Sequence, residues 1–110
     1  MDRRIEIVIL EMERRMSEAI RLSELARLSN LSRSRLRHLF KQETGMTPAQ
    51  YLRHVRLDQA ELLLRTTFLS VKEIAGKVGF HSVGNLSRSF RKVYGKLPTA
   101  YRNDAGPKQS

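Results

Sequence analysis

Two stretches of the sequence are rich in side chains that bind anions, and in each stretch these side chains alternate with regularly spaced apolar residues. The first, residues 33–44, carries Arg33, Arg35, Arg37, His38 and Lys41. The second, residues 83–94, carries Asn85, Ser87, Arg88, Arg91 and Lys92. Glu43 is the single acid in either stretch, whereas an ordinary solvated helix face mixes signs and pairs Glu with Lys. This concentration of like charge indicates a polyanionic partner.

The whole chain is strongly basic, with 21 Lys and Arg against 11 Asp and Glu among 110 residues and a net charge of +10. That charge favours nucleic acid or an anionic membrane surface as the partner. The basic residues are interleaved with 40% hydrophobic residues, enough for a packed core. No apolar run approaches the roughly 18 residues of a membrane span, and the N-terminal segment does not have the pattern of a signal peptide.

Residue types used in catalysis or metal binding are scattered along the chain. His38, His54 and His81 lie in separate segments, without an acidic partner or the spacing of metal ligands. Asp58 and Glu61 lie beside basic residues and are predicted to form ordinary ion pairs. Cysteine is absent, which excludes disulfides and thiolate metal sites. We therefore expect no enzyme activity, no metal and no cofactor.

The elements that hold the two basic stretches are predicted by an internal repeat. Apolar and turn residues recur 50 positions apart, as Leu36 and Leu86 do, and upstream of His81 the offset falls to 49. The same register pairs Phe40 with Phe90, Gly45 with Gly95, Pro48 with Pro98 and Tyr51 with Tyr101. The pentapeptide NLSRS, at residues 30–34 and 85–89, falls outside this register and is a coincidence. Two copies are too few for a solenoid, so we predict two linked helical motifs.

Each copy has the pattern of a helix-turn-helix motif. In the second copy, Ser70 and Glu73 have the spacing of a capping box, Gly79 permits a sharp turn, and Ser82 caps a second helix. Its predicted core positions are Ile74, Ala75, Val78, Leu86, Phe90 and Val93. In the first copy Asn30 takes the turn, and Arg21 replaces the capping Ser. We expect this substitution to weaken the start of that helix by about 1 kcal/mol.

The remaining segments complete an all-α prediction of about seven helices. Residues 47–65 begin with Thr-Pro and predict a connecting helix about 27 Å long, which could set the spacing of two reading helices or simply belong to a bundle core. An N-terminal helix is predicted from Ile5, Val8, Ile9, Met12 and Met16. The predicted domain covers residues 1–102, with motifs at about 20–45 and 70–95, and residues 103–110 are expected to form a flexible tail.

Several motifs in combination resemble the DNA-binding domain of the AraC/XylS transcription regulators. They include S-x-x-x-L-x-x-x-F-K from Ser32, R-L-x-x-A from Arg56, I-A-x-x-V-G-F from Ile74 and G-x-x-P-x-x-Y-R from Gly95. The resemblance runs from about Arg3 to Arg102. It implies two helix-turn-helix units joined by a long central helix, in a bacterial cytoplasmic, nucleoid-associated protein. It also implies that both recognition helices enter successive major grooves of double-stranded DNA and regulate transcription.

The resemblance also implies which residues contact DNA. The base-contacting positions fall on Ser34, Arg37, His38, Val83, Gly84, Asn85 and Arg88. Phosphate contacts are expected from Arg33, Arg35, Lys41, Arg91 and Lys92. Val83 and Gly84 stand where the family often has amide side chains, so we expect the first unit to carry more of the specificity.

Two other functions remain open at this stage. The chain could bind nucleic acid without sequence preference, as an RNA-binding or nucleoid-packing protein, or it could be a basic helical module that binds acidic proteins or a membrane. No membrane partner is expected for a regulator; RNA polymerase and a sensor or dimerisation domain of the same protein are further candidate partners. Most family members carry such a domain, so this chain is either a stand-alone regulator or part of a longer one.

Overall fold

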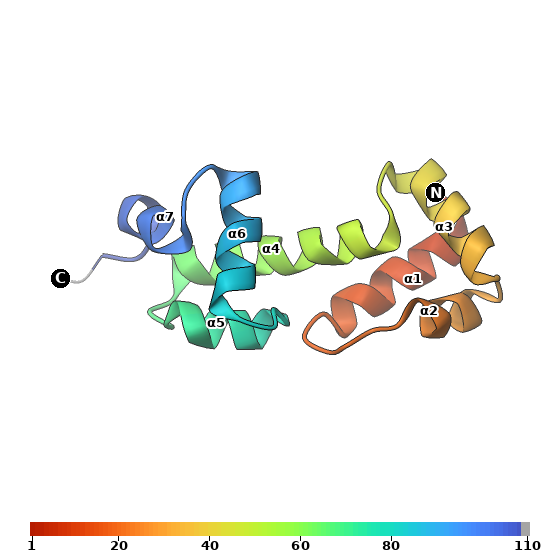
Figure 1. Ribbon diagram of the computed structural model, residues 1–110, viewed down its shortest axis with the longest axis horizontal. Helices are drawn as coiled ribbons and strands as arrows, with labels where there is room; N and C mark the ends of the chain where they lie inside the picture. The colour runs from red at the N-terminus through yellow and green to blue at the C-terminus, as the bar shows by residue number, and fades with distance from the viewer. Residues whose placement is uncertain (109–110) are drawn as a thin grey trace. The chain divides into compact units, whose positions relative to one another are not determined.

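The computed structural model describes residues 1–108, and its secondary structure is entirely helical over that range (Figure 1). The helices are α1 (Arg3–Arg14), α2 (Leu22–Ser29), α3 (Arg33–Thr44), α4 (Pro48–Thr66), α5 (Val71–Val78), α6 (Val83–Tyr94) and α7 (Pro98–Ala105). The chain divides into two compact units, residues 1–55 and 56–110, and α4 contributes to both. The predicted fold, two helix-turn-helix motifs joined by a long helix, is confirmed.

The first unit is built around the apolar face of α3. Leu36 and Phe40 are fully buried there, one helical turn apart. The residues that cover them from α1, α2 and the start of α4 are Ile5, Val8, Met12, Leu25, Ala26 and Leu52. The ring of Tyr51 meets Phe40 edge-on, with ring centroids 5.3 Å apart. The predicted α1 stripe therefore packs against the motif.

The second unit repeats this arrangement around α6. Leu86 and Phe90 are fully buried, packed with Leu57, Ala60, Leu64, Ile74, Ala75 and Val78. The ring of Tyr94 stacks on Phe90, with centroids 4.4 Å apart, and Tyr101 meets Phe90 edge-on. The prediction that Val93 belongs to the core is wrong, because its side chain is 47% exposed. Tyr94, one residue on, fills the third position of the apolar stripe instead.

Caps and turns fix where α3 and α6 begin and end. The Ser32 hydroxyl accepts the N–H of Arg35, and the Ser82 hydroxyl accepts that of Asn85, both at 3.1 Å. The turns before these helices use left-handed residues, Asn30 at φ 60° and Gly79 at φ 93°. Asn tolerates this region better than other residues with a side chain, and Gly enters it without steric cost. Both predicted turn positions are confirmed.

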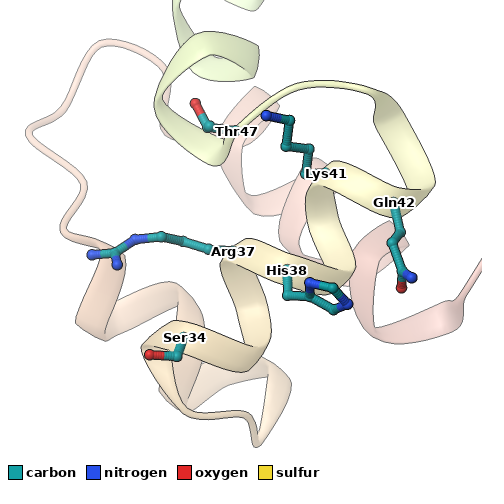
Figure 2. A pocket seen from close by; sticks show the side chains of 6 residues that line it. All are labelled: Ser34, Arg37, His38, Lys41, Gln42 and Thr47. Atoms are coloured by element: carbon teal, nitrogen blue, oxygen red, sulfur yellow. The ribbon is translucent and has the colours of Figure 1, made fainter.

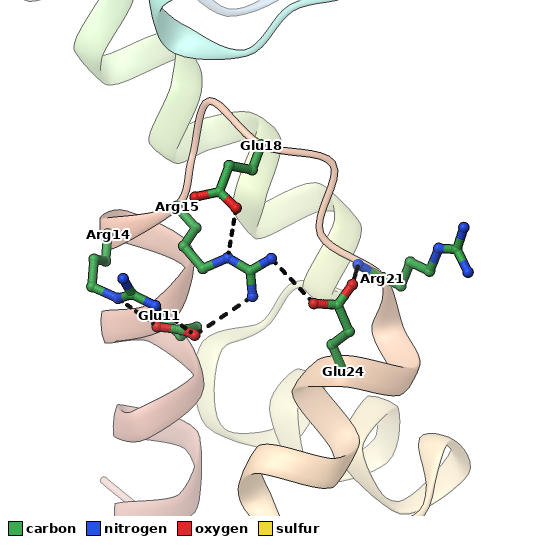
Figure 3. A network of polar contacts seen from close by, with 6 residues as sticks. All are labelled: Glu11, Arg14, Arg15, Glu18, Arg21 and Glu24. Atoms are coloured by element: carbon green, nitrogen blue, oxygen red, sulfur yellow. Dashed lines mark hydrogen bonds and ion pairs between the residues drawn. The ribbon is translucent and has the colours of Figure 1, made fainter.

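The start of α2 lacks a side-chain cap, as its sequence predicts, because the guanidinium of Arg21 has no acceptor atom. Glu24 still reaches back to accept the Arg21 backbone N–H at 3.4 Å. Arg15 holds this segment through ion pairs with Glu11, Glu18 and Glu24, the shortest N–O distances being 3.6, 3.1 and 3.1 Å (Figure 3). The Arg15 side chain is 20% exposed, so a partly shielded ionic network ties α2 to α1.

The C-terminal helix extends beyond its predicted end. We expected a tail from residue 103, but α7 continues to Ala105, where the Gly106 N–H donates to the Arg102 carbonyl at 2.7 Å. An ion pair between Lys96 and Asp104 supports this extra turn, a contact that composition alone does not reveal. Residues 109 and 110 of the predicted tail lie outside the described residues.

Replacing Arg21 with Ser should stabilise the protein by about 0.5–1 kcal/mol. Residue 21 already has the extended backbone of an N-cap (φ −93°, ψ 144°), and Glu24 is in place to complete a capping box. Ser70→Ala is the matched control, because it removes the cap hydrogen bond to Glu73 and should lower stability by about 1 kcal/mol. Urea denaturation measures both changes. A loss of stability in Arg21→Ser would contradict this account of α2.

The pH dependence of stability should include a contribution from Tyr94. Burial and the nearby carboxylates of Asp58 and Glu61 raise the pKa of Tyr94 to about 12, above its usual value of 10.0. The folded state thus holds this proton more tightly, so stability should fall as pH rises from about 10 to about 12. Tyr94→Phe should reduce the slope of that fall in denaturation curves, and should remove the highest-pH component of the 295 nm tyrosine titration. An unchanged slope and titration would contradict this assignment.

Candidate nucleic-acid interface

In the first unit, α3 presents its predicted contact residues to solvent. Ser34, Arg37 and His38, the predicted base-contacting residues, are all exposed. Arg33, Arg35 and Lys41, the predicted phosphate-contacting residues, are exposed as well. The helix can display them together because Leu36 and Phe40 alone anchor it at full burial. The Ser32 cap also directs the free N–H groups of the first turn outward, and such groups bind anions.

An open hollow on this unit adds two residues to those that the sequence grouped. It is lined by Ser34, Arg37, His38, Lys41, Gln42 and Thr47 (Figure 2). Gln42 and Thr47 were missed by the sequence analysis. Gln42 lies one turn beyond His38, a spacing that could have indicated it. Thr47 comes from the next helix start, where it forms a reciprocal cap with Gln50, so only the fold reveals its place here.

In the second unit, α6 presents a differently organised surface. Gly84 and Arg88 are exposed, Val83 is 39% exposed, and Asn85 is half-buried. The Arg88 guanidinium donates from Nη2 to Oδ1 of Asn85 at 2.6 Å. Arg91, predicted to contact phosphate, is exposed together with Lys92. The sequence analysis identified these residues but not the hydrogen bond between them.

In the part of the chain that the structure describes, the Arg and Lys side chains of α3 and α6 are not paired with acids. Within residues 1–108, none of the Arg or Lys side chains of α3 and α6 forms an ion pair. The acids are occupied elsewhere: Arg65 and Tyr101 hydrogen-bond to Glu61 and lower the pKa of its carboxyl. Six acids lie in the first 24 residues, among them Glu11, whose pKa is lowered mainly by Arg14. An unpaired cationic surface on two equivalent helices is suited to a polyanion.

The described residues hold neither a metal-ligand cluster nor a membrane-spanning helix. Over the described range, no three His, Asp or Glu side chains come together as metal ligands. The helices of residues 1–108 include none with the length and apolar character needed to cross a bilayer.

Comparison with solved structures places this arrangement in a known class. The DNA-binding domain of AdpA, solved in complex with a target DNA, is 33% identical and superposes with a TM-score of 0.88, covering 94% of this chain and 93% of that one. An AraC-type regulator from Chromobacterium violaceum is 27% identical, with a TM-score of 0.87 and coverage of 96% and 95%. The fold is thus that of a double helix-turn-helix domain.

Sequence comparison identifies the family. A family model described as a helix-turn-helix domain matches residues 25–104. The regulator MtrA of Neisseria gonorrhoeae is 31% identical over 107 residues, which are 97% of this chain and 36% of MtrA. The activator RhaR of Mannheimia succiniciproducens is 36% identical, over 91% of this chain and 36% of RhaR. This chain therefore belongs to the AraC family of helix-turn-helix transcription regulators, as its motifs predicted, and it spans little more than a third of the length of these two relatives.

Proposed function

We propose that this domain binds double-stranded DNA in a sequence-specific manner and regulates transcription, with α3 and α6 as the recognition helices. The observation that carries the proposal is the unpaired cationic surface of these two helices, each anchored by only two fully buried residues. An α-helix fits the major groove, where base pairs present distinct patterns of donors and acceptors. AdpA, whose fold this chain shares, was solved with target DNA, which supports duplex DNA as the partner.

We assign base reading to residues in the N-terminal half of each helix, all of them exposed except the half-buried Asn85. On α3 these are Ser34, Arg37 and His38, and on α6 they are Val83, Gly84, Asn85 and Arg88. Arg37 and Arg88 can each form bidentate hydrogen bonds with guanine O6 and N7. The methyl groups of Val83 can contact a thymine methyl.

Phosphate contacts set the affinity and its salt dependence. The residues proposed for them are Arg33, Arg35, Lys41, Arg91 and Lys92. The capped starts of α3 and α6 add backbone N–H groups that can donate to phosphate oxygens. Since each unit carries a complete reading helix, we propose that one chain reads an asymmetric, two-part site in successive major grooves.

The cellular setting follows from the family. We propose that the domain acts on the nucleoid in the bacterial cytoplasm, and that it has no catalytic activity. RNA polymerase is a candidate partner because RhaR, a relative, is an activator. A sensor or dimerisation domain is a second candidate, since this chain spans 36% of the length of MtrA.

Nucleic-acid binding without sequence preference is the second candidate function, and the net charge of +10 favours it as much as the first. Single-stranded binding has less support, because it requires exposed aromatic faces for base stacking. Phe40 and Phe90 are fully buried, and Tyr51, Tyr94 and Tyr101 are half-buried. Phe68, at 63% exposed, is the large aromatic left open to solvent among the described residues.

Selection of bound duplexes from a random pool should yield a two-part motif with centres about ten base pairs apart, one helical turn of B-DNA. A selected duplex should stay bound in an excess of random duplex, and footprinting should show protection in two neighbouring major grooves. Equal displacement by random duplex would favour the second candidate function. Protection confined to one groove would contradict the two-part site.

Arg88 and Arg91 should behave differently when replaced by Ala. Arg88→Ala should lower discrimination at one or two base pairs by about 1–3 kcal/mol. Arg91→Ala should weaken binding to every duplex alike and reduce the slope of log K against log salt by about 0.9. Arg88→Lys is the matched control, because it keeps the charge but loses the bidentate geometry. Fluorescence anisotropy titrations at several salt concentrations measure these effects, and sequence-blind losses from both Ala variants would argue against base reading by α6.

A further inference from the structure

We propose that Asn85 is a positioning residue for Arg88 rather than a second reader of bases, and that Gly84 leaves the space in which the Arg88 guanidinium lies. This inference rests on the proposed function, because the atom being positioned is the one that would bind a guanine. It leaves Val83 and Arg88 as the base-contacting residues of α6, with Asn85 and Gly84 acting through Arg88. Specificity of the second unit would then depend on residues that never touch DNA bases.

The first support is the use that Asn85 already makes of its polar groups. Its side-chain Oδ1 accepts the hydrogen bond from Arg88 Nη2 at 2.6 Å, a short distance for a donor that carries a full charge. Its backbone N–H donates to the Ser82 hydroxyl at the helix start. Asn85 is half-buried, while Arg88 is exposed. The less exposed Asn85 thus holds the more exposed Arg88 through this hydrogen bond.

The second support is the glycine at position 84. A Cβ atom there would lie 3.3 Å from Arg88 Nη1 and 3.8 Å from Ser82 Oγ, so the guanidinium lies directly against the bare backbone. The backbone itself does not require glycine, since the positive-φ residues of the described chain are Asn30, Gly45, Gly79 and Gly95. Glycine is among the poorest helix formers. Its bare backbone lets the Arg88 guanidinium lie close to the start of α6.

Holding the guanidinium before binding has two consequences. A free Arg side chain loses rotamer entropy when it binds, and a side chain that is already ordered loses less, so the contact with guanine is stronger. One N–H of Arg88 is used by Asn85, and the remaining N–H groups are enough for a bidentate pair with O6 and N7. The fixed direction also restricts which base pair Arg88 can reach, which increases specificity.

The test is a double-mutant cycle on a duplex chosen by selection. Affinities are measured for that duplex and for one in which the base pair read by Arg88 is changed, using the wild type, Asn85→Ala, Arg88→Ala and the double variant. We expect Asn85→Ala to lower the preference at this same base pair by about threefold to tenfold, part of the loss expected for removing a bidentate pair. The double variant should match Arg88→Ala within about twofold, since coupled residues are not additive. Loss of preference at a different base pair, or losses that multiply, would overturn the proposal.

A conservative variant separates positioning from base reading. Asn85→Asp keeps an oxygen that can accept from Arg88 but removes the amide donors that reading an adenine requires. Its negative charge should weaken binding to every duplex, while the preference at the Arg88 base pair remains within about twofold of wild type. If Asn85→Asp loses that preference as fully as Asn85→Ala does, Asn85 acts in another way.

Gly84→Ala separates an effect on base preference from an effect on stability. The added methyl should improve helix stability yet push the Arg88 guanidinium away from the backbone, so the melting temperature should rise while the preference at the Arg88 base pair falls. Gly76→Ala on α5 is the matched control, because a Cβ there meets nothing within 4 Å; it should raise the melting temperature and leave the preference unchanged. An unchanged preference in Gly84→Ala would overturn the proposal. If the wild type itself shows no base preference, the proposed function fails, and this inference fails with it.

Discussion

The interaction on which this structure depends is the burial of two apolar side chains, one helical turn apart, on α3 and again on α6. Leu36 and Phe40 anchor α3, and Leu86 and Phe90 anchor α6, all fully buried. Burying a side chain of this kind contributes about 1.5–3 kcal/mol, whereas like charges one turn apart on a helix cost only about 0.2–0.5 kcal/mol per pair. Burial of these two side chains therefore outweighs the repulsion among the cations on the same helix. Because only two residues are fully buried, most of the helix surface stays accessible to a ligand.

Because only two side chains of each helix are fully buried, other interactions must fix where the helix begins and ends. Ser32 and Ser82 supply hydrogen bonds at the starts of α3 and α6, and both helices end at a left-handed glycine. These residue types have strong local preferences, which is why the sequence alone placed the ends of α3 and α6 correctly. The buried apolar residues could be predicted equally well, because they recur in the same register in both copies. Most of the fold was thus predictable from local chemistry and periodicity.

The features that the sequence did not predict all depend on contacts between elements or on side-chain direction. The Arg15 network joins residues of α1, the following loop and α2, and no local pattern identifies which of several acids Arg15 will meet. Val93 and Tyr94 are both apolar enough for the stripe, and stacking on Phe90 favours the larger ring. Thr47 reaches the hollow beside α3 only because α4 begins there. The family resemblance identified the candidate site residues, but only the structure shows how their side chains are arranged.

Side-chain geometry also changes the comparison between the contact residues proposed for the two units. The sequence favoured the first unit, since Val83 and Gly84 offer few hydrogen-bonding groups. In the described chain, however, the Ser34, Arg37 and His38 side chains make no hydrogen bond or ion pair with other residues, so they must be ordered when a ligand binds. Arg88, by contrast, already forms a hydrogen bond with Asn85 and lies beside Gly84. A surface with fewer polar groups can therefore discriminate more sharply when its one strong donor is held in place. If Arg88 reads a base as proposed, the glycine at position 84 contributes to that specificity by leaving room for the guanidinium.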